Sequence, residues 1–353
     1  MLTSDGPTAA ATGPARTPPR QSRHLPPFVV ATVGLGLLLL CSILSLVLGP
    51  RSIPLSTVLD ALTGSAHGAG ANPDADVVTG LRVPRTLIGL VVGGALGVAG
   101  VVAQGVTRNP LASPTTLGIN AGAGFAVVAA IFVFHLATPL EYVWFAVAGA
   151  AGAAVLVHVL AMRPGDVDPV RLALAGTVLT AMLASWTMAL MLASQRTLDE
   201  ARFWLAGSIG GRDLGVLVRV LPFVVVGLLL AFLVAPSLNA LALGDEAAHA
   251  LGVPVARMRL IGGGAVVLLA AGAVAAAGPI PFVGLAAPHL VRPLLGGDHR
   301  RLIPACFVAG ATLLLAADVL GRLVARPSEL ETGIVTALLG APLLAWLARR
   351  TAR

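Results

Sequence analysis

The chain has 353 residues, of which 57% are hydrophobic and 11% are charged, and its formal net charge is +7. Soluble domains usually carry about a quarter of their residues as charged side chains, so this chain has too little charge to cover a water-exposed surface. All 23 basic residues are arginines, which excludes a P-loop ATPase because that motif needs a lysine at the phosphates. The arginines lie at the ends of apolar runs and form no single patch, which argues against nucleic-acid binding.

The first 27 residues are rich in Pro, Ala, Thr and Arg and show no apolar periodicity. Such a segment cannot bury enough apolar surface to offset the entropy of ordering, so we predict a disordered cytoplasmic tail over residues 1–27. The apolar run that follows has the length of a membrane span rather than that of a signal-peptide core. Residues 28–353 are therefore predicted to form one transmembrane domain.

Ten apolar runs follow one another along the chain, at residues 28–48, 86–106, 117–135, 140–162, 172–194, 217–235, 260–278, 281–295, 302–323 and 333–348. In a bilayer each run must be helical, because every backbone polar group needs an internal partner. We predict an all-α, polytopic membrane protein with about ten transmembrane helices. Small residues such as Gly93 and Gly97 allow the helices to approach closely.

Ten crossings place both termini on the same side of the membrane. Fourteen of the 23 arginines then share that side and nine lie on the other. Cytoplasmic segments carry an excess of basic residues, so the count favours cytoplasmic termini. The outer side still keeps more arginines than orientation alone predicts.

Charged residues stand at two positions of special interest. Arg82 and Arg85 precede the second run in the sequence RVPRT, where Pro84 suits a helix start. On the outer face they can meet carboxylates bidentately, or they can anchor the helix end in the interface. Asp318 and Arg322 are four residues apart within the ninth run and can pair on one helix face. A charge inside a span suggests function, with a structural ion pair as the alternative.

Proline and glycine interrupt the apolar pattern in QGVTRNPLASP (104–114) and GPIPFVGLAAPHLVR (278–292). Irregular backbone at membrane depth is buried or lines a water-filled path, although an ordinary tight loop explains the first segment equally well. His289 and His299 are ten residues apart and lack a cysteine partner. We therefore expect no metal site.

A candidate partner-binding helix lies between the sixth and seventh runs, in LGDEAAHALGV (243–253). Leu243, Ala247, Ala250 and Leu251 form a short apolar stripe. Two acidic residues fall in its first turn, where the helix dipole favours them, and Gly252 suits the helix end. Such a helix can fill a groove on a partner, and an ordinary surface helix is the alternative.

Together these segments resemble the iron-siderophore and vitamin B12 permease family (FecCD-type) of ABC importers. The resemblance runs from about residue 28 to the C-terminus. It rests on five stretches in order: RVPRTL, QGVTRNPLASPTTLGINAG, LALGDEAAHALGV, PFVGLAAPHLVR with GGDHRRLIP, and ADVLGR with SELETGIVTALLGAP. Glu331 and Thr332 depart from the Pro-Val that the family tends to show before Gly333, which affects only the local turn.

The resemblance implies a type II ABC importer permease fold, with two such subunits, identical or paralogous, around a central path in the bacterial inner membrane. It implies no cofactor on this chain, two ATPase subunits that hold ATP and Mg, and an extracytoplasmic substrate-binding protein. The chain is then expected to be a transporter subunit and not an enzyme. Its expected cargo is a ferric siderophore or a similar iron or metal chelate.

The resemblance also implies roles for individual residues. Arg82, Arg85 and Arg322 match positions that meet carboxylates of the binding protein. Coupling to the ATPase maps to the region of about 237–258, in particular to Leu243, Gly244, Asp245, Glu246, Ala247, Leu251 and Gly252. The cytoplasmic gate maps to Asn109, Leu111, Pro169 and Val170.

Two alternatives stay open at this point. The same architecture also suits cobalamin or haem, and the sequence does not distinguish these cargoes. A gradient-driven secondary transporter would carry ionisable relays at mid-membrane, for which Asp318 is almost the only candidate. A membrane enzyme would need a nucleophile–base or metal constellation, and we find none in the sequence.

Overall fold

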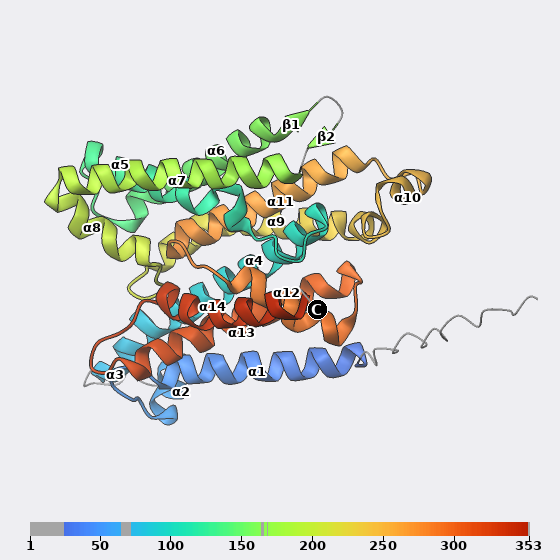
Figure 1. The fold of residues 1–353 in the computed structure, drawn as a ribbon. Helices are drawn as coiled ribbons and strands as arrows, with labels where there is room; N and C mark the ends of the chain where they lie inside the picture. The colour runs from blue at the N-terminus through green and yellow to red at the C-terminus, as the bar shows by residue number, and fades with distance from the viewer. Residues whose placement is uncertain (1–24, 65–71, 164–165, 168, 352–353) are drawn as a thin grey trace, which may run out of the picture.

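The computed structural model describes residues 25–64, 72–163, 166–167 and 169–351, which form an elongated bundle of helices (Figure 1). Residues 1–24 of the predicted tail lie outside the described residues. The helices are α1 (Pro27–Val47), α2 (Leu55–Thr63), α3 (Pro73–Val77), α4 (Val83–Thr107), α5 (Ile119–Phe134), α6 (Pro139–Ala161), α7 (Pro169–Ala193), α8 (Gln195–Ala206), α9 (Leu214–Leu241), α10 (Asp245–Ala250), α11 (Val255–Ala277), α12 (Val283–Leu295), α13 (His299–Val324) and α14 (Thr332–Thr351). A π-helical turn η1 (Val78–Arg82), a 3-10 turn η2 (Pro114–Leu117) and the paired strands β1 (Met162–Arg163) and β2 (Asp166–Val167) complete the chain.

All ten predicted apolar runs fold as helices, which confirms the expected all-α polytopic class. Seven helical segments of the described chain are long and apolar enough to cross a membrane, and they contain α1, α4, α6, α7, α9, α11 and α13. The other three apolar helices, α5, α12 and α14, fall short of that test over their described residues. The 13 residues of α12 extend only about 20 Å, less than the hydrocarbon thickness, and most of them are buried against α4 and α13.

The two ends of the bundle carry different short elements (Figure 1). One end, which we call the α8 end, holds α2, α3 and α8. The opposite end, which we call the α10 end, holds α10 and the β1–β2 hairpin. The first residues of α1 and the last residues of α14 both point toward the α10 end, as an even number of crossings requires.

The second span begins earlier than the sequence predicts. Pro84 was expected to mark the helix start, but the helical backbone is continuous from Pro73 through η1 to Thr107. A proline inside a helix has no N–H to donate to the preceding turn. The π-helical turn immediately before Pro84 accommodates this missing bond, so Arg82 and Arg85 belong to a continuous helix rather than to its first turn.

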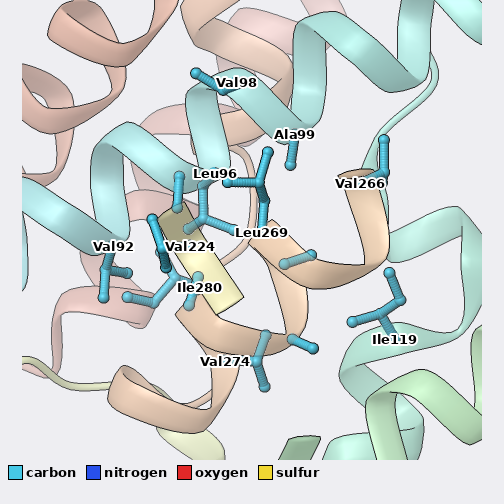
Figure 2. Packing of buried hydrophobic residues seen from close by; sticks show 14 of the residues in the cluster. Val92, Leu96, Val98, Ala99, Ile119, Val224, Val266, Leu269, Val274 and Ile280 are labelled. Carbon is cyan, nitrogen blue, oxygen red and sulfur yellow. The ribbon is translucent and has the colours of Figure 1, made fainter. Parts of the chain in front are cut away.

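Helix α4 forms the centre of the bundle. In its most apolar stretch 83% of the residues are buried, against 6% for α1 at the periphery. Its side chains Val92 and Leu96 belong to one hydrophobic cluster together with Val224 of α9, Leu269 of α11 and Ile119 of α5 (Figure 2). The elements that carry charge at both ends are therefore connected through a single, closely packed helix.

The close approach of α4 to α13 depends on glycine. A Cβ atom at Gly97 would lie 2.2 Å from the carbonyl oxygen of Cys306, and one at Gly93 would lie 2.5 Å from that of Gly310. A Cβ at Gly100 would lie 1.6 Å from the carbonyl oxygen of Gly284 in α12. Gly93 and Gly97, which the sequence singled out, thus lie where the backbones of α4 and α13 touch, as expected for helix packing in membranes.

Three connecting segments meet near the α8 end and fix the start of α14. The backbone N–H of Gly333 donates to the carbonyl oxygen of Gly207 (2.8 Å), and that of Ser208 donates to Ala277 (2.7 Å). Gly207 and Gly278 both have positive φ, 75° and 73°, a conformation that glycine adopts without steric cost. This junction holds Thr332, the first residue of α14, beside α13.

We predict that Gly97→Ala destabilises the protein, because the added methyl group must push two backbones apart. Overpacking of this kind costs about 1–3 kcal/mol, so the midpoint of thermal unfolding in detergent should fall. Gly36→Ala is the matched control, since a Cβ at Gly36 of α1 meets no atom within 4 Å and alanine favours a helix. An unchanged midpoint for Gly97→Ala would contradict the packing described for α4.

Candidate functional site: charged networks at the two ends of the bundle

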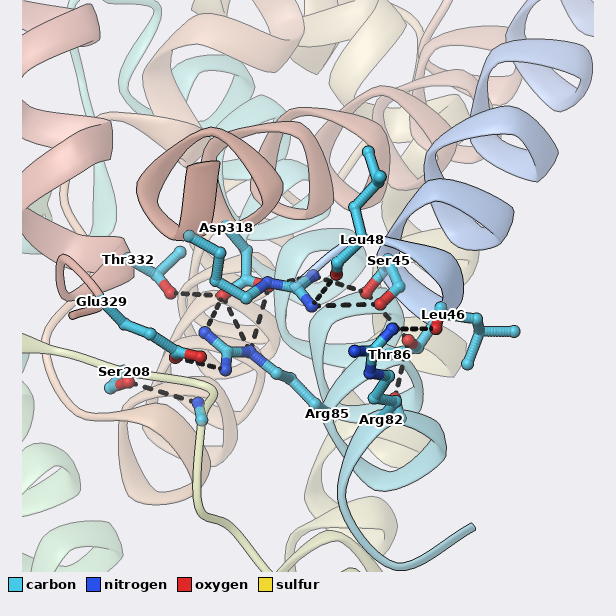
Figure 3. Close-up of polar contacts among 12 residues, drawn as sticks. Ser45, Leu46, Leu48, Arg82, Arg85, Thr86, Ser208, Asp318, Glu329 and Thr332 are labelled. Atoms are coloured by element: carbon cyan, nitrogen blue, oxygen red, sulfur yellow. Dashed lines mark hydrogen bonds and ion pairs between the residues drawn. The ribbon is translucent and has the colours of Figure 1, made fainter. Parts of the chain in front are cut away.

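The network at the α8 end is centred on the carboxylate of Asp318 in α13, which is fully buried (Figure 3). Arg322, one turn along the same helix, places Nη2 2.8 Å from Oδ2. Arg85 of α4 places Nη2 2.8 Å from Oδ1 and Nε 3.1 Å from both oxygens. The Thr332 hydroxyl donates to Oδ1 (3.0 Å). A buried carboxylate is tolerated only with such partners.

Two of the three predicted docking arginines hold the end of α1. Arg82 Nη1 donates to the carbonyl oxygens of Leu46 (2.6 Å) and Val47 (2.7 Å), and its Nη2 donates to that of Arg51. Arg322 Nη1 donates to the carbonyl oxygens of Ser45 (3.1 Å) and Leu48 (2.7 Å). The last carbonyls of a helix lack intrahelical partners and carry partial negative charge. The two guanidinium groups therefore cap the C-terminus of α1.

The three arginines are more buried than a docking surface on the outer face suggests. The sequence placed Arg82 and Arg85 on the outer face, within reach of a partner's carboxylates, and the resemblance gave Arg322 the same role, whereas Arg82 and Arg322 are only 6% and 2% exposed. Arg85 is also mostly buried, and its Nη1 lies 2.6 Å from Oε2 of Glu329 in the α13–α14 connection. The Asp318–Arg322 pair that the four-residue spacing predicted has the expected geometry, but it belongs to a larger network. The docking role of the three arginines stays a prediction.

At the α10 end, Asp245 connects three elements. It is the first residue of α10, and both of its oxygens accept from Arg259 Nη2 of α11 (3.0 and 2.9 Å). Arg108 Nη2, at the end of α4, lies 3.5 Å from Oδ2. The short helix α10 is thereby fixed to the central helix and to α11, although neither arginine was a predicted coupling residue.

The predicted coupling helix is shorter than its sequence pattern. Only Asp245–Ala250 is helical, so Leu243 and Gly244 precede the helix and Leu251 and Gly252 follow it. Both leucines are largely exposed, at 69% and 65%, while Ala248 faces the bundle. Gly252 has a φ of 78° and ends the helix as expected. The segment therefore presents two apolar side chains outward at the α10 end.

The predicted gate segment forms a tight turn after α4. Arg108 adopts a left-handed conformation (φ 51°) and ends α4, and the Asn109 side chain accepts from the backbone N–H of Leu111 (2.9 Å). Leu111 is exposed. Pro169 and Val170 are the first two residues of α7, which packs on η2 directly after this turn. The two parts of the predicted gate thus belong to neighbouring elements.

A second polar cluster at the α10 end was not predicted. Asn239 of α9 donates to Asp298 Oδ1 (2.7 Å) and accepts from the backbone N–H of His299 (2.8 Å). The hydrogen bond from Asn239, with the backbone N–H of Arg300 and the nearby charge of Arg301, lowers the pKa of the Asp298 carboxyl. The cluster ties α9 to the start of α13, and its residues lie 59 positions apart, so no local pattern indicates it.

Comparison with known proteins places this helical membrane protein among the transport permeases. A sequence model of the FecCD transport family matches residues 37–350. The ferric enterobactin transport system permease protein FepD of Escherichia coli (strain K12) is 44% identical over 326 residues, covering 92% of this chain and 96% of that protein. The Fe(3+)-citrate import system permease protein YfmD of Bacillus subtilis (strain 168) is 38% identical, covering 94% and 96%. The chain therefore belongs to the FecCD transport family.

A solved structure agrees with this assignment. It is described as an inward-facing conformation of a metal-chelate type ABC transporter, and it matches with a TM-score of 0.79 at 28% sequence identity. The match covers 92% of this chain and 99% of that chain. The fold found here is thus shared over nearly its whole length with a transporter permease.

We predict that Asp318→Asn destabilises the protein strongly, because it leaves the buried Arg322 without its ion-pair partner and removes one of the two carboxylates that hold Arg85. Breaking a buried ion pair in this way costs about 3–5 kcal/mol, measurable as a lower midpoint of thermal unfolding in detergent. The control is Asp199→Asn, which removes a carboxylate from an exposed pair with Arg202 (3.6 Å) and should cost less than about 1 kcal/mol. Equal effects of the two substitutions would contradict the central role of Asp318.

Proposed function

We propose that this chain is the membrane-spanning permease subunit of an ATP-driven, binding-protein-dependent importer of a ferric siderophore or a similar iron chelate. The observation that carries the proposal is the match over more than nine tenths of the chain to permeases named for ferric enterobactin and ferric citrate. The exposed apolar surface supports a membrane location, since Leu39 of α1, Leu192 of α7 and Leu229 of α9 are more than 60% exposed and such side chains suit lipid.

The proposal divides the partners between the two ends of the bundle. An ATPase subunit binds at the α10 end, where Leu243 and Leu251 flank α10 and can enter a groove on its surface. The extracytoplasmic binding protein docks at the α8 end, above the arginine network. Both termini are then cytoplasmic, and two permease subunits, identical or paralogous, enclose the path. ATP and Mg belong to the partner, and this chain supplies no catalytic group.

Asp245 supplies a physical route from the ATPase to the gate. Its carboxylate holds both Arg108, next to Asn109 and Leu111, and Arg259 of α11. A displacement of α10 by the ATPase therefore acts directly on the end of α4 and on the turn that follows it. The movement would then reach Pro169 and Val170, the second part of the gate, because α7 packs on η2 directly after this turn.

A gradient-driven secondary transporter is the alternative of another class. Its best relay candidate is Asp318, but two guanidinium groups and a hydroxyl already occupy this carboxylate. A relay side chain must exchange partners during transport, whereas this carboxylate is held by groups from three helices, α4, α13 and α14. Import of cobalamin or haem is the second alternative, in which the architecture is the same and the cargo differs.

Transport by the reconstituted system tests the proposal. The permease, its ATPase and its binding protein are placed in proteoliposomes and offered ferric enterobactin, ferric citrate, a ferric hydroxamate, cobalamin and haem in turn. We expect uptake of a ferric chelate that requires ATP and continues when an uncoupler collapses the proton gradient. Uptake that survives ATP depletion and stops with the uncoupler would support the secondary transporter instead, and uptake of cobalamin or haem alone would change the cargo.

We predict that the double substitution Leu243→Ala and Leu251→Ala releases the ATPase from the permease. Burial of a leucine contributes about 1.5–3 kcal/mol, so loss of both side chains should weaken the complex by about a hundredfold or more. Co-purification and ATPase stimulation provide the measurement. Leu62→Ala is the control, because Leu62 of α2 is similarly exposed at the opposite end. Normal co-purification of the double variant would reject the coupling assignment.

A further inference from the structure

The three arginines at the α8 end differ in whether a partner could take over one of their bonds. Arg82 and Arg322 donate to main-chain carbonyl oxygens at the end of α1. Those acceptors cannot leave without unfolding the last turn of α1, and replacing them would leave orphan carbonyls behind. Both arginines are also almost completely buried. They are therefore unsuited to direct contact with another protein.

Arg85 is different because its guanidinium group is shared between two carboxylates (Figure 3). Nε and Nη2 hold the buried Asp318, while Nη1 holds Glu329 at 2.6 Å. The Asp318 side chain is 0% exposed and that of Glu329 is 35% exposed. Asp318 is fixed within α13, whereas Glu329 lies in the connection between α13 and α14. Among the carboxylates that pair with Arg85 in the described part of the chain, Glu329 on Nη1 is the one with access to solvent.

The balance of charge favours an anion at this edge. Two guanidinium groups, those of Arg85 and Arg322, are paired with two carboxylates, those of Asp318 and Glu329. If Glu329 turned away, Asp318 alone would face both guanidinium groups, and one positive charge would be left without a partner at a mostly buried site. An incoming carboxylate can restore the balance through a charge-assisted hydrogen bond of the same kind.

We propose that Glu329 occupies the position on Arg85 that an acidic side chain of the extracytoplasmic binding protein takes when that protein docks. Docking then exchanges one carboxylate for another, so no buried charge is left unpaired at the end of the exchange. The proposal rests on the proposed function, because it requires a binding protein at the α8 end. It assigns direct docking to Arg85 alone among the three arginines and assigns a structural role to the other two.

The exchange also explains how docking could reach the rest of the permease. Glu329 is three residues before Thr332, whose hydroxyl donates to Asp318 and which begins α14. The backbone N–H of Leu330 donates to the carbonyl oxygen of Gly321 (3.4 Å), which joins this connection to α13. Release of Glu329 therefore loosens the segment that leads directly into α14. A partner without an acidic residue at this place would leave Glu329 where it is, which provides selectivity.

The test measures the affinity of the detergent-solubilised permease–ATPase complex for the purified chelate-binding protein of the same transport system at low ionic strength. Glu329→Gln keeps the shape of the side chain and removes the competing charge. We expect the dissociation constant to fall by about fivefold or more, within the usual range of coupling between linked sites. Glu331→Gln is the matched control, because it removes a charge from the same connection but is not among the ion-pair partners of Arg85 in the described chain.

Arg85→Lys separates failure of this proposal from failure of the docking role. Lysine keeps the charge beside Asp318 but cannot bind two carboxylates through a planar fork, so we expect weaker docking, and the thermal midpoint reports whether the variant is folded. Weaker docking by Glu329→Gln, or no change in that variant while Arg85→Lys docks less tightly, would overturn the exchange and keep Arg85 as a docking residue. Unchanged affinity in both folded variants would overturn the docking role itself.

Discussion

A carboxylate without solvent exposure, that of Asp318, is the constraint on which the α8 end of this protein depends. A buried charge must be paired, and here the pairing needs groups from three helices: Arg85 from α4, Arg322 from α13 and Thr332 from α14. Once Arg322 is drawn to Asp318, its remaining donors reach the carbonyls at the end of α1. One acidic residue thereby sets the relative positions of four helices.

This arrangement is feasible only because α4 can lie close to its neighbours. The glycines along α4 let its backbone touch those of α12 and α13, which brings Arg85 within reach of Asp318. The same helix ends at Arg108, beside Asp245. Helix α4 therefore connects a charged network at one end to a charged network at the other. This continuity gives the proposed importer a rigid element through which events at its two faces can influence each other, without requiring a separate signalling path.

Sequence patterns predicted the features that depend on near neighbours. Ten apolar runs became ten helices, and the Asp318–Arg322 pair could be expected because residues four apart share a helix face. Contacts between distant segments could not be predicted in this way. Arg85 and Glu329 are 244 positions apart, and Asn239 and Asp298 are 59 apart. The burial of these arginines could not be predicted for the same reason, since the carbonyl acceptors in α1 have no signature in the sequence. Pro84 suggested that the helix starts there, but the π-helical turn η1 just before it accommodates the missing N–H and the helix continues.

The α8 end has one fixed carboxylate, that of Asp318, and two arginines, Arg82 and Arg322, that hold the end of α1. We propose that the Nη1 edge of the third arginine, Arg85, exchanges its carboxylate partner. The most direct test is a structure of the permease, with its ATPase, bound to its loaded binding protein. The account predicts an acidic side chain of the binding protein within hydrogen-bond distance of Arg85 Nη1, Glu329 turned into solvent, and Asp318 still between Arg85 and Arg322. A docked complex in which Glu329 remains on Arg85, or in which Asp318 has lost its arginines, would contradict it.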